Sequence, residues 1–600
     1  MNQSTENKKG IFVSRMQIAL VLAGNIFILL LFWIRSGGGS PAQASTEIGE
    51  TEAQLATSTS LIAPTSDALA PSPTQAPTIR TEQPAAARIF ADPVVVMSLN
   101  IDGYANLYAY NLNEGSYIQI TKDGWDDIHP AISPDGRQVA YASNRGGFWD
   151  IYTLDISDGV IHAVTDDPQY DGRPTWSPDG AWIAYETYLD DNLEIAFALA
   201  ASKVEPIRLT TNSTSDHSPA WSPIGRKVAF VSDRTGSWDI WLVDLDESGS
   251  DRMQNFTTNT LADQFIPNWS VDGKYISWSA ASDGVQSVYF SEFETGMDPI
   301  YALQGSEMHW GPDNVHAAAT FFVPEAYYLA IYERPSFNPL FPPIQLPGQL
   351  EGMDWGPLKI PTALPEGFES FDADELASEL TGGQAPSEGA IFGRQLTLPL
   401  GDVEAPHAEL SALAVEPFFT LRERVLQEAG WDVLSSLEQA FVPLTEALEP
   451  GRSQDWLYTG RAFTLPPTYL DVGWLVAAKE EYTGRVYWRV FVRAMKQDGS
   501  QGRPLRQQPW DFNARFSSNT TYYEQGGTTF TEIPPGYWVD FTALAQAYGW
   551  ERLPALSSWQ FYFHAARFNE FVITSGLEWE DAMLQLYPPE ILATPSPVSR

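Results

Sequence analysis

The chain of 600 residues carries a repeat of about 45 residues, and a period of this length leaves few possible folds. Each copy contains a serine that opens a tight turn, and these serines are 44, 45 and 48 residues apart: Ser133, Ser177, Ser222 and Ser270. Two shorter copies begin at Met308 and Met353, which makes six copies. Such a period indicates a repeated supersecondary unit that buries its apolar faces against neighbouring copies.

Each period predicts four short strands. A Trp-containing run comes first, and a Ser-Pro-Asp-Gly turn follows, in which Pro presets φ and Gly accepts a positive φ. Alternating apolar residues then predict strands such as 138–142 and 149–154. The fourth strand ends at a threonine: Thr121, Thr165, Thr210 and Thr257. Four strands in a period of about 40 to 50 residues are typical of a β-propeller.

The two ends of the repeat region complement each other. Residues 94–121 supply three strands without the Trp-containing first strand, and the last copy, at Trp355, supplies a first strand with nothing after it. Joining the two completes a sixth blade and leaves no open sheet edge. We therefore predict an all-β propeller of six blades over residues 90–357, closed by pairing between its two ends in the manner of velcro.

Aspartate and tryptophan recur at fixed positions of the repeat. We interpret them as scaffold, with each aspartate holding the loop that enters its blade through hydrogen bonds to the backbone. A cation site is the alternative, because carboxylate oxygens suit Ca²⁺. We also expect Arg145 to pair with Asp150, and Arg234 with Asp239, across hairpins. The repeat positions are Asp127, Asp171, Asp216, Asp263, Trp176, Trp221 and Trp269.

These repeats resemble the TolB-like propeller family, in which DxxPxWSPDG followed by IAFxSxRxGxxDIY recurs. The resemblance covers about 265 residues and implies the propeller fold, which in this family serves protein-binding scaffolds and domains that cap hydrolases. The matching residues are Asp171, Pro174, Trp176 and 177–180, with 232–234, Gly236 and 239–241 from the next copy.

The N-terminus predicts a membrane anchor. Residues 16–34 contain only two polar residues, Gln17 and Asn25, and as a helix they reach about 30 Å, enough to cross a bilayer. Basic residues before this run place 1–15 in the cytoplasm and the rest of the chain outside. Residues 35–89, rich in Ala, Ser, Thr and Pro, predict a disordered linker. A signal peptide cleaved after Ala44 is the alternative, and it also exports the chain.

Composition excludes several classes of protein. The net charge is -41, which leaves no electrostatic means of binding a nucleic-acid backbone. With no cysteine, the chain has no disulfides and no thiolate metal site. We expect no cofactor and no bound metal.

After the repeats the pattern changes to that of a mixed domain. Residues 358–393 are rich in Pro and Gly and predict a linker with a short helix at 372–380, residues 394–588 predict an α+β domain, and 589–600 a tail. The run 485–493 predicts a strand. Helical spacing of apolar residues predicts helices at 415–429, 432–448, 540–548, 559–571 and 579–586.

The sequence of the C-terminal domain contains neither of two common catalytic motifs, GxSxG and HExxH. The runs 430–444 and 455–465 resemble the zinc D-alanyl-D-alanine carboxypeptidase family, whose signature is HxxGxAxD followed by ExxH. Gly460 and Ala462 match this signature, and His564 matches the last zinc ligand. Because Leu457 and Thr464 replace a ligand and the Asp, and Phe561 replaces the catalytic Glu, the resemblance implies an inactive descendant.

Two functions follow as hypotheses. The first is a membrane-anchored, extracytoplasmic binding or scaffold protein whose propeller binds a protein, peptide or glycan of the cell envelope. The alternative is a cell-wall hydrolase, either zinc peptidase-like or a glycosidase that uses paired acids such as Glu480 and Glu481. The first hypothesis assigns no catalytic residue, and the sequence alone does not identify the binding residues.

Overall fold

The computed structural model describes residues 90–592, apart from 102, 203, 250–251, 259–261, 283–284, 296–297, 324–325, 373–394 and 449–451. The chain divides into two units, Met1–Glu82 and Gln83–Arg600, and all described residues belong to the second. The predicted anchor at 16–34, the linker at 35–89 and the helix at 372–380 fall outside the described residues, except for Asp372. No helix in the described part of the chain is long and apolar enough to span a membrane.

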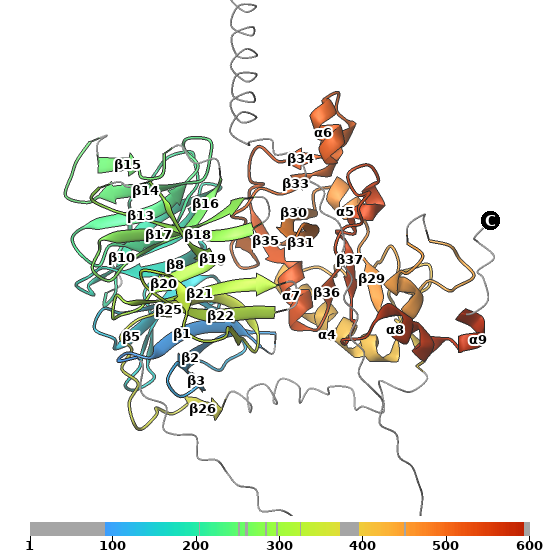
Figure 1. The fold of residues 1–600 in the computed structure, drawn as a ribbon, viewed down its shortest axis with the longest axis horizontal. Coiled ribbons are helices and arrows are strands. Elements are labelled where there is room, and N and C mark those ends of the chain that lie inside the picture. The colour runs from blue at the N-terminus through green and yellow to red at the C-terminus, as the bar shows by residue number, and fades with distance from the viewer. Residues whose placement is uncertain are drawn as a thin grey trace, which may run out of the picture. The chain divides into compact units, whose positions relative to one another are not determined.

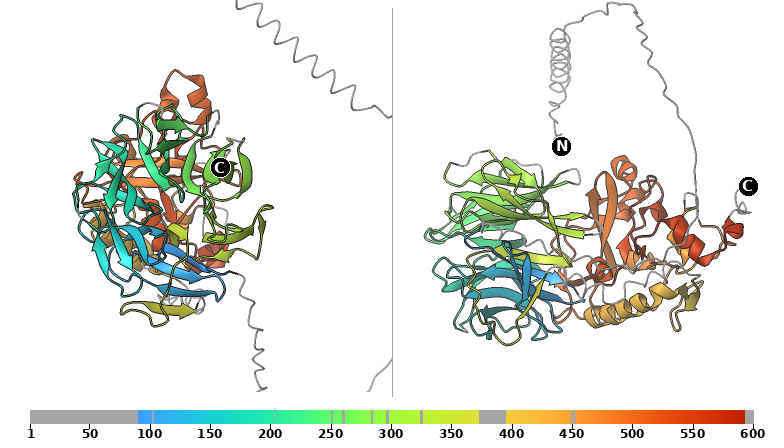
Figure 2. Two further views of the ribbon diagram at one scale, coloured as in Figure 1. Left: turned by 90° about the vertical axis from the view of Figure 1, so that its left-hand side faces the viewer. Right: turned by 60° about the horizontal axis from the view of Figure 1, so that its bottom comes forward.

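The first part of the described chain is built of antiparallel sheets, coloured blue to yellow in Figures 1 and 2. Sheet 1 has the order β25 (Gln349–Trp355), β1 (Val94–Asn100), β2 (Ala105–Asn111), β3 (Ser116–Gln119) and β26 (Glu369–Asp372). Sheet 2 contains β4 (Asp127–Ile132), β5 (Gln138–Ser143), β6 (Asp150–Asp155) and β7 (Ile161–Ala163). Sheet 3 contains β8 (Asp171–Trp176), β9 (Trp182–Leu189), β10 (Asn192–Leu199) and β11 (Ile207–Arg208).

Three more sheets repeat this pattern. Sheet 4 contains β12 (Asp216–Trp221), β13 (Lys227–Ser232), β14 (Asp239–Asp244) and β15 (Met253–Asn255). Sheet 5 contains β16 (Gln264–Trp269), β17 (Tyr275–Ser282), β18 (Val285–Glu292) and β19 (Ile300–Gln304). Sheet 6 contains β20 (Glu307–Trp310), β21 (His316–Val323), β22 (Ala326–Glu333) and β23 (Asn338–Pro339), with β24 (Ile344–Gln345) also paired to β22.

The leading strands of the sheets contact one another in succession. β4 contacts β8, and the contacts continue through β12, β16 and β20 to β25, which in turn contacts β4. β1 and β25 pair antiparallel, with Val95 opposite Trp355, as the incomplete repeats at the two ends predict. β1 is buried along its whole length, because its alternate residues pack into apolar clusters on both faces of the sheet.

The Ser-Pro-Asp-Gly sequence forms the predicted turn between the first two strands of a sheet. In sheet 3, the backbone N–H of Gly180 donates to the carbonyl of Ser177 at 2.9 Å, and Gly180 has a φ of 69°. The hydroxyl of Ser177 accepts a hydrogen bond from the N–H of Trp182 at 2.9 Å, which fixes the start of β9. The turn therefore supplies its own hydrogen bonds and needs glycine at its last position.

The propeller region extends further along the chain than the sequence predicts. Residues 369–372 were expected in the linker, but they form β26, which pairs with β3 on the outer edge of sheet 1. The side chain of Lys122 also reaches Glu369 at 2.7 Å. This part of the predicted linker is therefore a strand.

The rest of the described chain forms a mixed domain, coloured orange to red in Figure 1. Its helices are α4 (Ala412–Ala429), α5 (Thr468–Asp471), α6 (Thr520–Gln525), α7 (Phe541–Ala547), α8 (Trp579–Leu586) and α9 (Pro589–Leu592), with 3₁₀ turns η2 (Trp456–Thr459), η3 (Phe512–Phe516) and η4 (Phe563–Ala566). Its longer strands are β30 (Leu475–Tyr482) and β31 (Arg485–Arg493), which pair along their full length.

Shorter strands complete this domain. β31 also pairs with β35 (Tyr537–Asp540), which pairs with β32 (Arg503–Pro504). β37 (Glu570–Val572) pairs with β29 (Ala462–Thr464) and β36 (Glu551–Arg552). Two separate pairs are β27 (Thr397–Pro399) with β28 (Glu409–Ser411), and β33 (Trp510–Asp511) with β34 (Thr528–Thr529).

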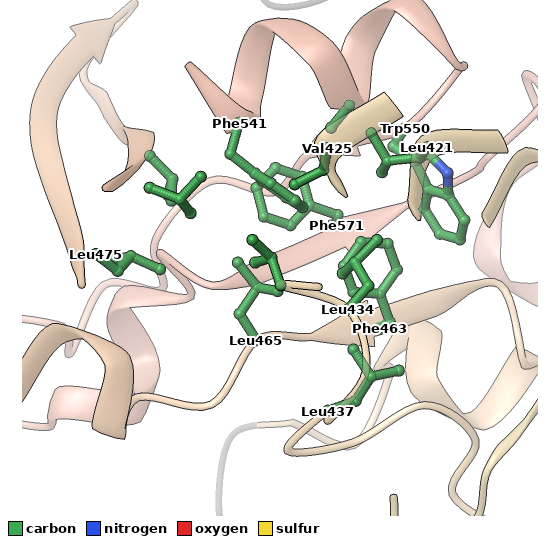
Figure 3. Packing of buried hydrophobic residues seen from close by; sticks show 14 of the residues in the cluster. Leu421, Val425, Leu434, Leu437, Phe463, Leu465, Leu475, Phe541, Trp550 and Phe571 are labelled. Carbon is green, nitrogen blue, oxygen red and sulfur yellow. The ribbon is translucent and has the colours of Figure 1, made fainter. Parts of the chain in front are cut away.

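The core of the C-terminal domain lies between α4 and the short strands (Figure 3). Leu421 and Val425 extend from α4 toward the rings of Phe463 and Phe571, and all four side chains are buried. The indole of Trp550 lies edge-on against Phe463, with ring centroids 4.6 Å apart. Offset and edge-on aromatic contacts of this kind add to the stabilisation that apolar burial supplies.

Two predicted helices of this domain are wrong. Residues 432–448 have no helix, although Leu434 and Leu437 are buried in the core. Their backbone bonds to β29 instead, since the N–H of Glu438 donates to the carbonyl of Thr464 at 2.9 Å. Residues 559–571 contain only the 3₁₀ turn η4 and the beginning of β37. The turn ends at Arg567, whose φ of 53° is incompatible with a continuing right-handed helix.

Candidate binding site

A polar pocket lies where the leading strands of the six sheets meet. We call it the central pocket; its volume is about 110 Å³. Each of the strands β4, β8, β12, β16, β20 and β25 contributes residues, and none of the lining residues comes from the C-terminal domain. The residues that carry polar side chains are His129, Arg173, Thr175, Ser218, Asn268, Glu307, His309 and Asp354.

The backbone has an unusual conformation at this pocket. His129, Arg173, Ser218 and Ile266 occupy the same position in four successive leading strands, and their φ angles are 53°, 48°, 52° and 51°. Each of them precedes a proline, and the pairing register with the next strand shifts at this point. A positive φ is uncommon for non-glycine residues and is rarer still for a branched residue such as Ile266. Such strain often accumulates at functional sites.

His309 has a carboxylate beside each ring nitrogen. Its Nδ1 lies 3.1 Å from Oδ1 of Asp354, and its Nε2 lies 2.9 Å from Oε1 of Glu307. Burial lowers the pKa of His309, but the hydrogen bonds to Asp354 and Glu307 outweigh burial and raise the pKa to about 9. The imidazole is therefore charged at neutral pH. The side-chain amide of Asn268 lies 3.2 Å from the same Nδ1.

Arg173 brings a second positive charge to the pocket. Among the described residues, none accepts a hydrogen bond from its Nε. Burial and then repulsion from Arg506 lower the pKa of Arg173, while the carboxylates of Glu186 and Glu307 partly offset this effect. The half-buried guanidinium is thus a cation whose Nε has spare hydrogen-bonding capacity.

The C-terminal domain binds the propeller through buried ion pairs. The Nε of Arg506 donates to Oε1 of Glu186 at 3.0 Å, and Arg506 also contacts the hydroxyl of Tyr170. The other carboxylate oxygen of Glu186 accepts a hydrogen bond of 2.9 Å from the backbone N–H of Ser218, which lines the central pocket. Burial raises the pKa of Glu186, but Arg506 and then Arg173 outweigh it and lower the pKa to about 2.

Two further arginines of the C-terminal domain repeat this arrangement. Arg503 lies 3.1 Å from Glu351, and Arg424 lies 2.9 Å from Asp126. A second cavity, of about 50 Å³, is lined by both parts of the chain, including Asp126, Glu351 and Arg503. The local sequence carries no signal for these pairs, because their partners are separated by 152 to 320 residues.

The repeated aspartates differ from one another in their partners. Arg145 pairs with Asp127 at 2.7 Å and Arg234 with Asp216 at 2.7 Å, so the expected pairs with Asp150 and Asp239 are wrong. Each arginine contacts the aspartate at the start of its own sheet. Asp263 does not share this register position, because Gln264 stands in sheet 5 where Asp216 stands in sheet 4. Asp263, one residue earlier, accepts a hydrogen bond of 3.3 Å from the backbone N–H of Trp238. Asp171 has neither an arginine partner nor a backbone N–H donor among the described residues.

The repeated tryptophans connect neighbouring sheets. Trp176 donates from Nε1 to the carbonyl of Ala131 at 3.0 Å, and Trp269 donates to the carbonyl of Ala220 at 3.1 Å. Each bond therefore runs from one leading strand to the leading strand of the preceding sheet. The Nε1 of Trp221 is buried with no partner among the described residues, and its ring packs against Phe197 at 5.0 Å.

The peptidase-like positions occupy separate elements. Gly460 follows η2 with a φ of 67°, and Ala462 begins β29. His564 lies in η4, between the rings of Tyr562 and Phe563. In the described chain, the only group of His, Cys, Asp and Glu side chains spaced to hold a metal lies in the propeller. The equivalent of the first zinc ligand, Leu457, is fully buried among apolar residues.

An ionic cluster is found beside these positions instead. Asp455 pairs with Arg452 at 2.7 Å and with Arg567 at 2.9 Å, and Arg567 also pairs with Glu570 at 3.1 Å. Two acids and two bases therefore satisfy each other in the interior. The paired acids Glu480 and Glu481 are likewise engaged, by Arg552 at 2.6 Å and by Lys479 respectively.

The fold is mostly β, with sheets arranged as in a β-propeller. Residues 92–205 and 164–312 match the family model of the TolB beta propeller domain, and the propeller is therefore TolB-like. The Protein TolB homolog of Chlorobaculum tepidum is 33% identical over 75 residues, which is 12% of this chain and 16% of that protein.

Two solved structures of low sequence identity also match parts of the chain. TolB from Acinetobacter baumannii is 20% identical, with 44% of this chain and 66% of that chain covered and a TM-score of 0.38. An oligogalacturonate lyase from Vibrio parahaemolyticus is 14% identical, with 43% and 80% covered and a TM-score of 0.32.

Proposed function

We propose that this protein is a membrane-anchored binding or scaffold protein of the cell envelope, which uses the central pocket of a six-bladed, closed TolB-like ring to bind a protein or peptide ligand. The succession of contacts between leading strands and the pairing of β1 with β25 support the ring. The apolar run at 16–34, with basic residues before it, supports an anchor that leaves the propeller outside the cytoplasm.

The state of Arg173 carries the proposal. Its guanidinium lines the same central pocket as the charged His309, and its Nε has no partner among the described residues. The neighbouring acids are already engaged, since Asp354 and Glu307 contact His309. A ligand carboxylate would therefore find an available cation, whose charge-assisted hydrogen bonds offset the water that the carboxylate loses on entering the pocket. The acidic side chains or the C-terminus of a peptide supply such a group.

The C-terminal domain acts in this proposal as a support. Glu186 connects Arg506 of that domain to the backbone of Ser218 in the pocket, so the two parts of the chain share one hydrogen-bonded network. Groups that are held in this way pay less entropy when a ligand binds. The ionic cluster around Asp455 stabilises the domain itself.

The test uses the full chain in detergent and a peptide library in which each acidic peptide is matched by its amide counterpart. We expect acidic peptides to bind about tenfold or more tightly than the amides, because a charge-assisted hydrogen bond contributes roughly 1.5–3 kcal/mol. Arg173→Gln should remove this difference. Arg137→Gln, which changes an exposed arginine in a turn, is the matched control and should preserve it.

Two results would contradict the proposal. One is binding by Arg173→Gln equal to that of the unaltered protein, and the other is no preference for carboxylates at any concentration. Retention on purified peptidoglycan in place of peptides would assign the ligand to the glycan class.

A further inference from the structure

Three carboxylates come together at the junction of sheets 2 and 3. Asp150 is the first residue of β6, Asp171 is the first residue of β8, and Asp167 lies in the connection between the two sheets. One oxygen atom from each of the three lies within 4.8 Å of the others. Asp150 and Asp171 are buried, and Asp167 is half-buried.

Asp171 is the member of this cluster that points to a ligand. Its side chain is fully buried, and neither carboxylate oxygen accepts a hydrogen bond from any described residue. Burial and then repulsion from Asp167 raise the pKa of Asp171 well above its usual range, and the nearby hydroxyls of Thr187 and Thr165 offset only part of this rise. A buried carboxylate without hydrogen bonds is costly to keep ionised, so it either takes up a proton or binds a cation that compensates its charge.

In the neighbouring repeats, an arginine compensates the charge of the aspartate that is equivalent to Asp171. Asp127, Asp171 and Asp216 occupy one register position, opposite Ser143, Thr187 and Ser232 respectively. Two residues beyond those partners stand Arg145, Leu189 and Arg234. The arginines pair with Asp127 and Asp216. Among sheets 2, 3 and 4, only sheet 3 has an apolar residue, Leu189, in place of the compensating arginine.

The residue four positions before the repeated aspartate also differs between the junctions. At the junction of sheets 3 and 4, the residue equivalent to Asp167 is Asn212, whose amide donates to Asp216 at 2.6 Å. At the junction of sheets 2 and 3, Asp167 is itself an acid, and its N–H donates to Asp150 at 3.1 Å. Compared with the junction of sheets 3 and 4, this junction therefore loses a positive charge and gains a negative one. At the junction of sheets 1 and 2 the equivalent residue, Asp123, is also an acid, but there Arg145 lies 3.3 Å from it.

We propose that Asp150, Asp167 and Asp171 bind a divalent cation, with calcium as the preferred ion. Carboxylate oxygens are the hard ligands that calcium takes, and its six to eight ligands tolerate irregular geometry that magnesium does not. Three carboxylates supply up to six oxygens, and one of them, Asp167, is partly exposed to solvent. The cation takes the place of the arginine found in the adjacent repeats.

The proposed site also lies beside the C-terminal domain. Asp167 is followed by Pro168, and the backbone of Gly499 lies so close to the Pro168 carbonyl that an added Cβ would approach it to 2.3 Å. A cation that holds the connection between β7 and β8 would therefore hold one of the surfaces on which the C-terminal domain rests. Calcium should stabilise both parts of the chain together.

The test uses the full chain in detergent, stripped with EDTA and titrated with calcium chloride. We expect calorimetry to show one site per chain, with a dissociation constant of roughly 10⁻⁴–10⁻³ M, as in extracellular calcium modules. We expect the melting temperature to rise by roughly 2–5 °C at about 10 mM calcium. Asp171→Asn should abolish both effects and should melt no lower than the unaltered protein in EDTA, because it removes a charge from an acidic cluster.

Asp216→Asn is the matched control, since it alters the same repeat position where an arginine is present. It should melt lower with and without calcium, because Arg234 loses its partner, and it should keep the calcium-induced rise. No heat and no rise in the unaltered protein would overturn the proposal, as would a full rise in Asp171→Asn. If Asp171→Asn lowered the melting temperature in EDTA as much as Asp216→Asn does, Asp171 would be assigned to the scaffold. A rise in melting temperature with magnesium equal to the rise with calcium would overturn the choice of calcium.

Discussion

The guanidinium of Arg506 and the carboxylate of Glu186 are joined by a 3.0 Å hydrogen bond between residues 320 positions apart. Glu186 has no exposed surface, and its second oxygen binds the backbone of Ser218 at the central pocket. This one pair therefore connects the C-terminal domain with the interior of the propeller.

Arg506→Ala should lower the free energy of unfolding by about 3–5 kcal/mol, because it leaves Glu186 as a buried charge without its main partner. Chemical denaturation of the full chain measures the change. The double variant Arg506→Ala with Glu186→Gln should recover part of the loss, since the uncompensated charge is gone. A loss below about 1 kcal/mol for the single variant would show that the pair behaves like an exposed salt bridge.

Stability should fall on the alkaline side because of His309. Its pKa is raised from 6.5 to about 9 in the folded protein, so its contribution is complete below pH 6.5 and is lost as the pH rises through 9. The shift corresponds to roughly 3 kcal/mol. His309→Gln should flatten the pH dependence of unfolding between these values. An unchanged slope in this variant would refute the assignment.

Stability should fall on the acid side because of Glu186. Its pKa is lowered from 4.5 to about 2, so its contribution is present above pH 4.5 and is lost as the pH falls toward 2. Denaturation curves of the unaltered protein and of Glu186→Gln should therefore converge in stability as the pH approaches 2. Parallel pH profiles of the two proteins would contradict this expectation.

The variants Gly136→Ala and Gly180→Ala distinguish the cost of a positive φ in a non-glycine residue from the cost of a steric clash. Both glycines end a Ser-Pro-Asp-Gly turn, with φ angles of 71° and 69°. An added Cβ at Gly136 would lie 1.9 Å from the carbonyl oxygen of Pro357, whereas nothing lies within 4 Å of one at Gly180. We expect Gly180→Ala to cost about 1 kcal/mol in unfolding free energy and Gly136→Ala several times as much. Equal losses would show that Pro357 moves aside freely.

Trp176→Phe and Trp221→Phe test the bonds between sheets. The first removes the hydrogen bond from Nε1 to the carbonyl of Ala131 and should cost at least about 1 kcal/mol. The second removes a buried N–H that has no partner among the described residues and should cost less. Thermal unfolding of the two variants side by side measures the difference. A larger loss of stability for Trp221→Phe than for Trp176→Phe would contradict the view that the hydrogen bond of Trp176 stabilises the contact between sheets.

The sequence predicted the repeated strands and turns, but it did not predict backbone structure that depends on contacts between residues far apart in the chain. A period of about 45 residues was enough to predict the strands around Ser177 and the pairing of Trp355 with β1, because turn chemistry and alternation are local. The run at 432–448 has helical spacing, but contacts with β29 decide its backbone. Periodicity alone does not distinguish these outcomes.

The candidate site was only partly visible in the sequence. His129, Arg173, Ser218 and Ile266 each precede a proline in the repeat, and this signal marks the pocket lining without indicating that it is a pocket. The contacts of His309 with Asp354 come from different sheets, so no local spacing predicts them. The partner of Arg145 was predicted wrongly, because the guanidinium reaches back to the first strand of its sheet and not across the hairpin.

The pairing of β1 with β25 has a consequence for how the chain is made. Synthesis proceeds from the N-terminus, so β1 leaves the ribosome more than 250 residues before its partner. Until residues 349–355 arrive, one edge of this apolar strand is unpaired and open to other chains. A product truncated before Gln349 should therefore aggregate or be degraded, and would not persist as a smaller propeller.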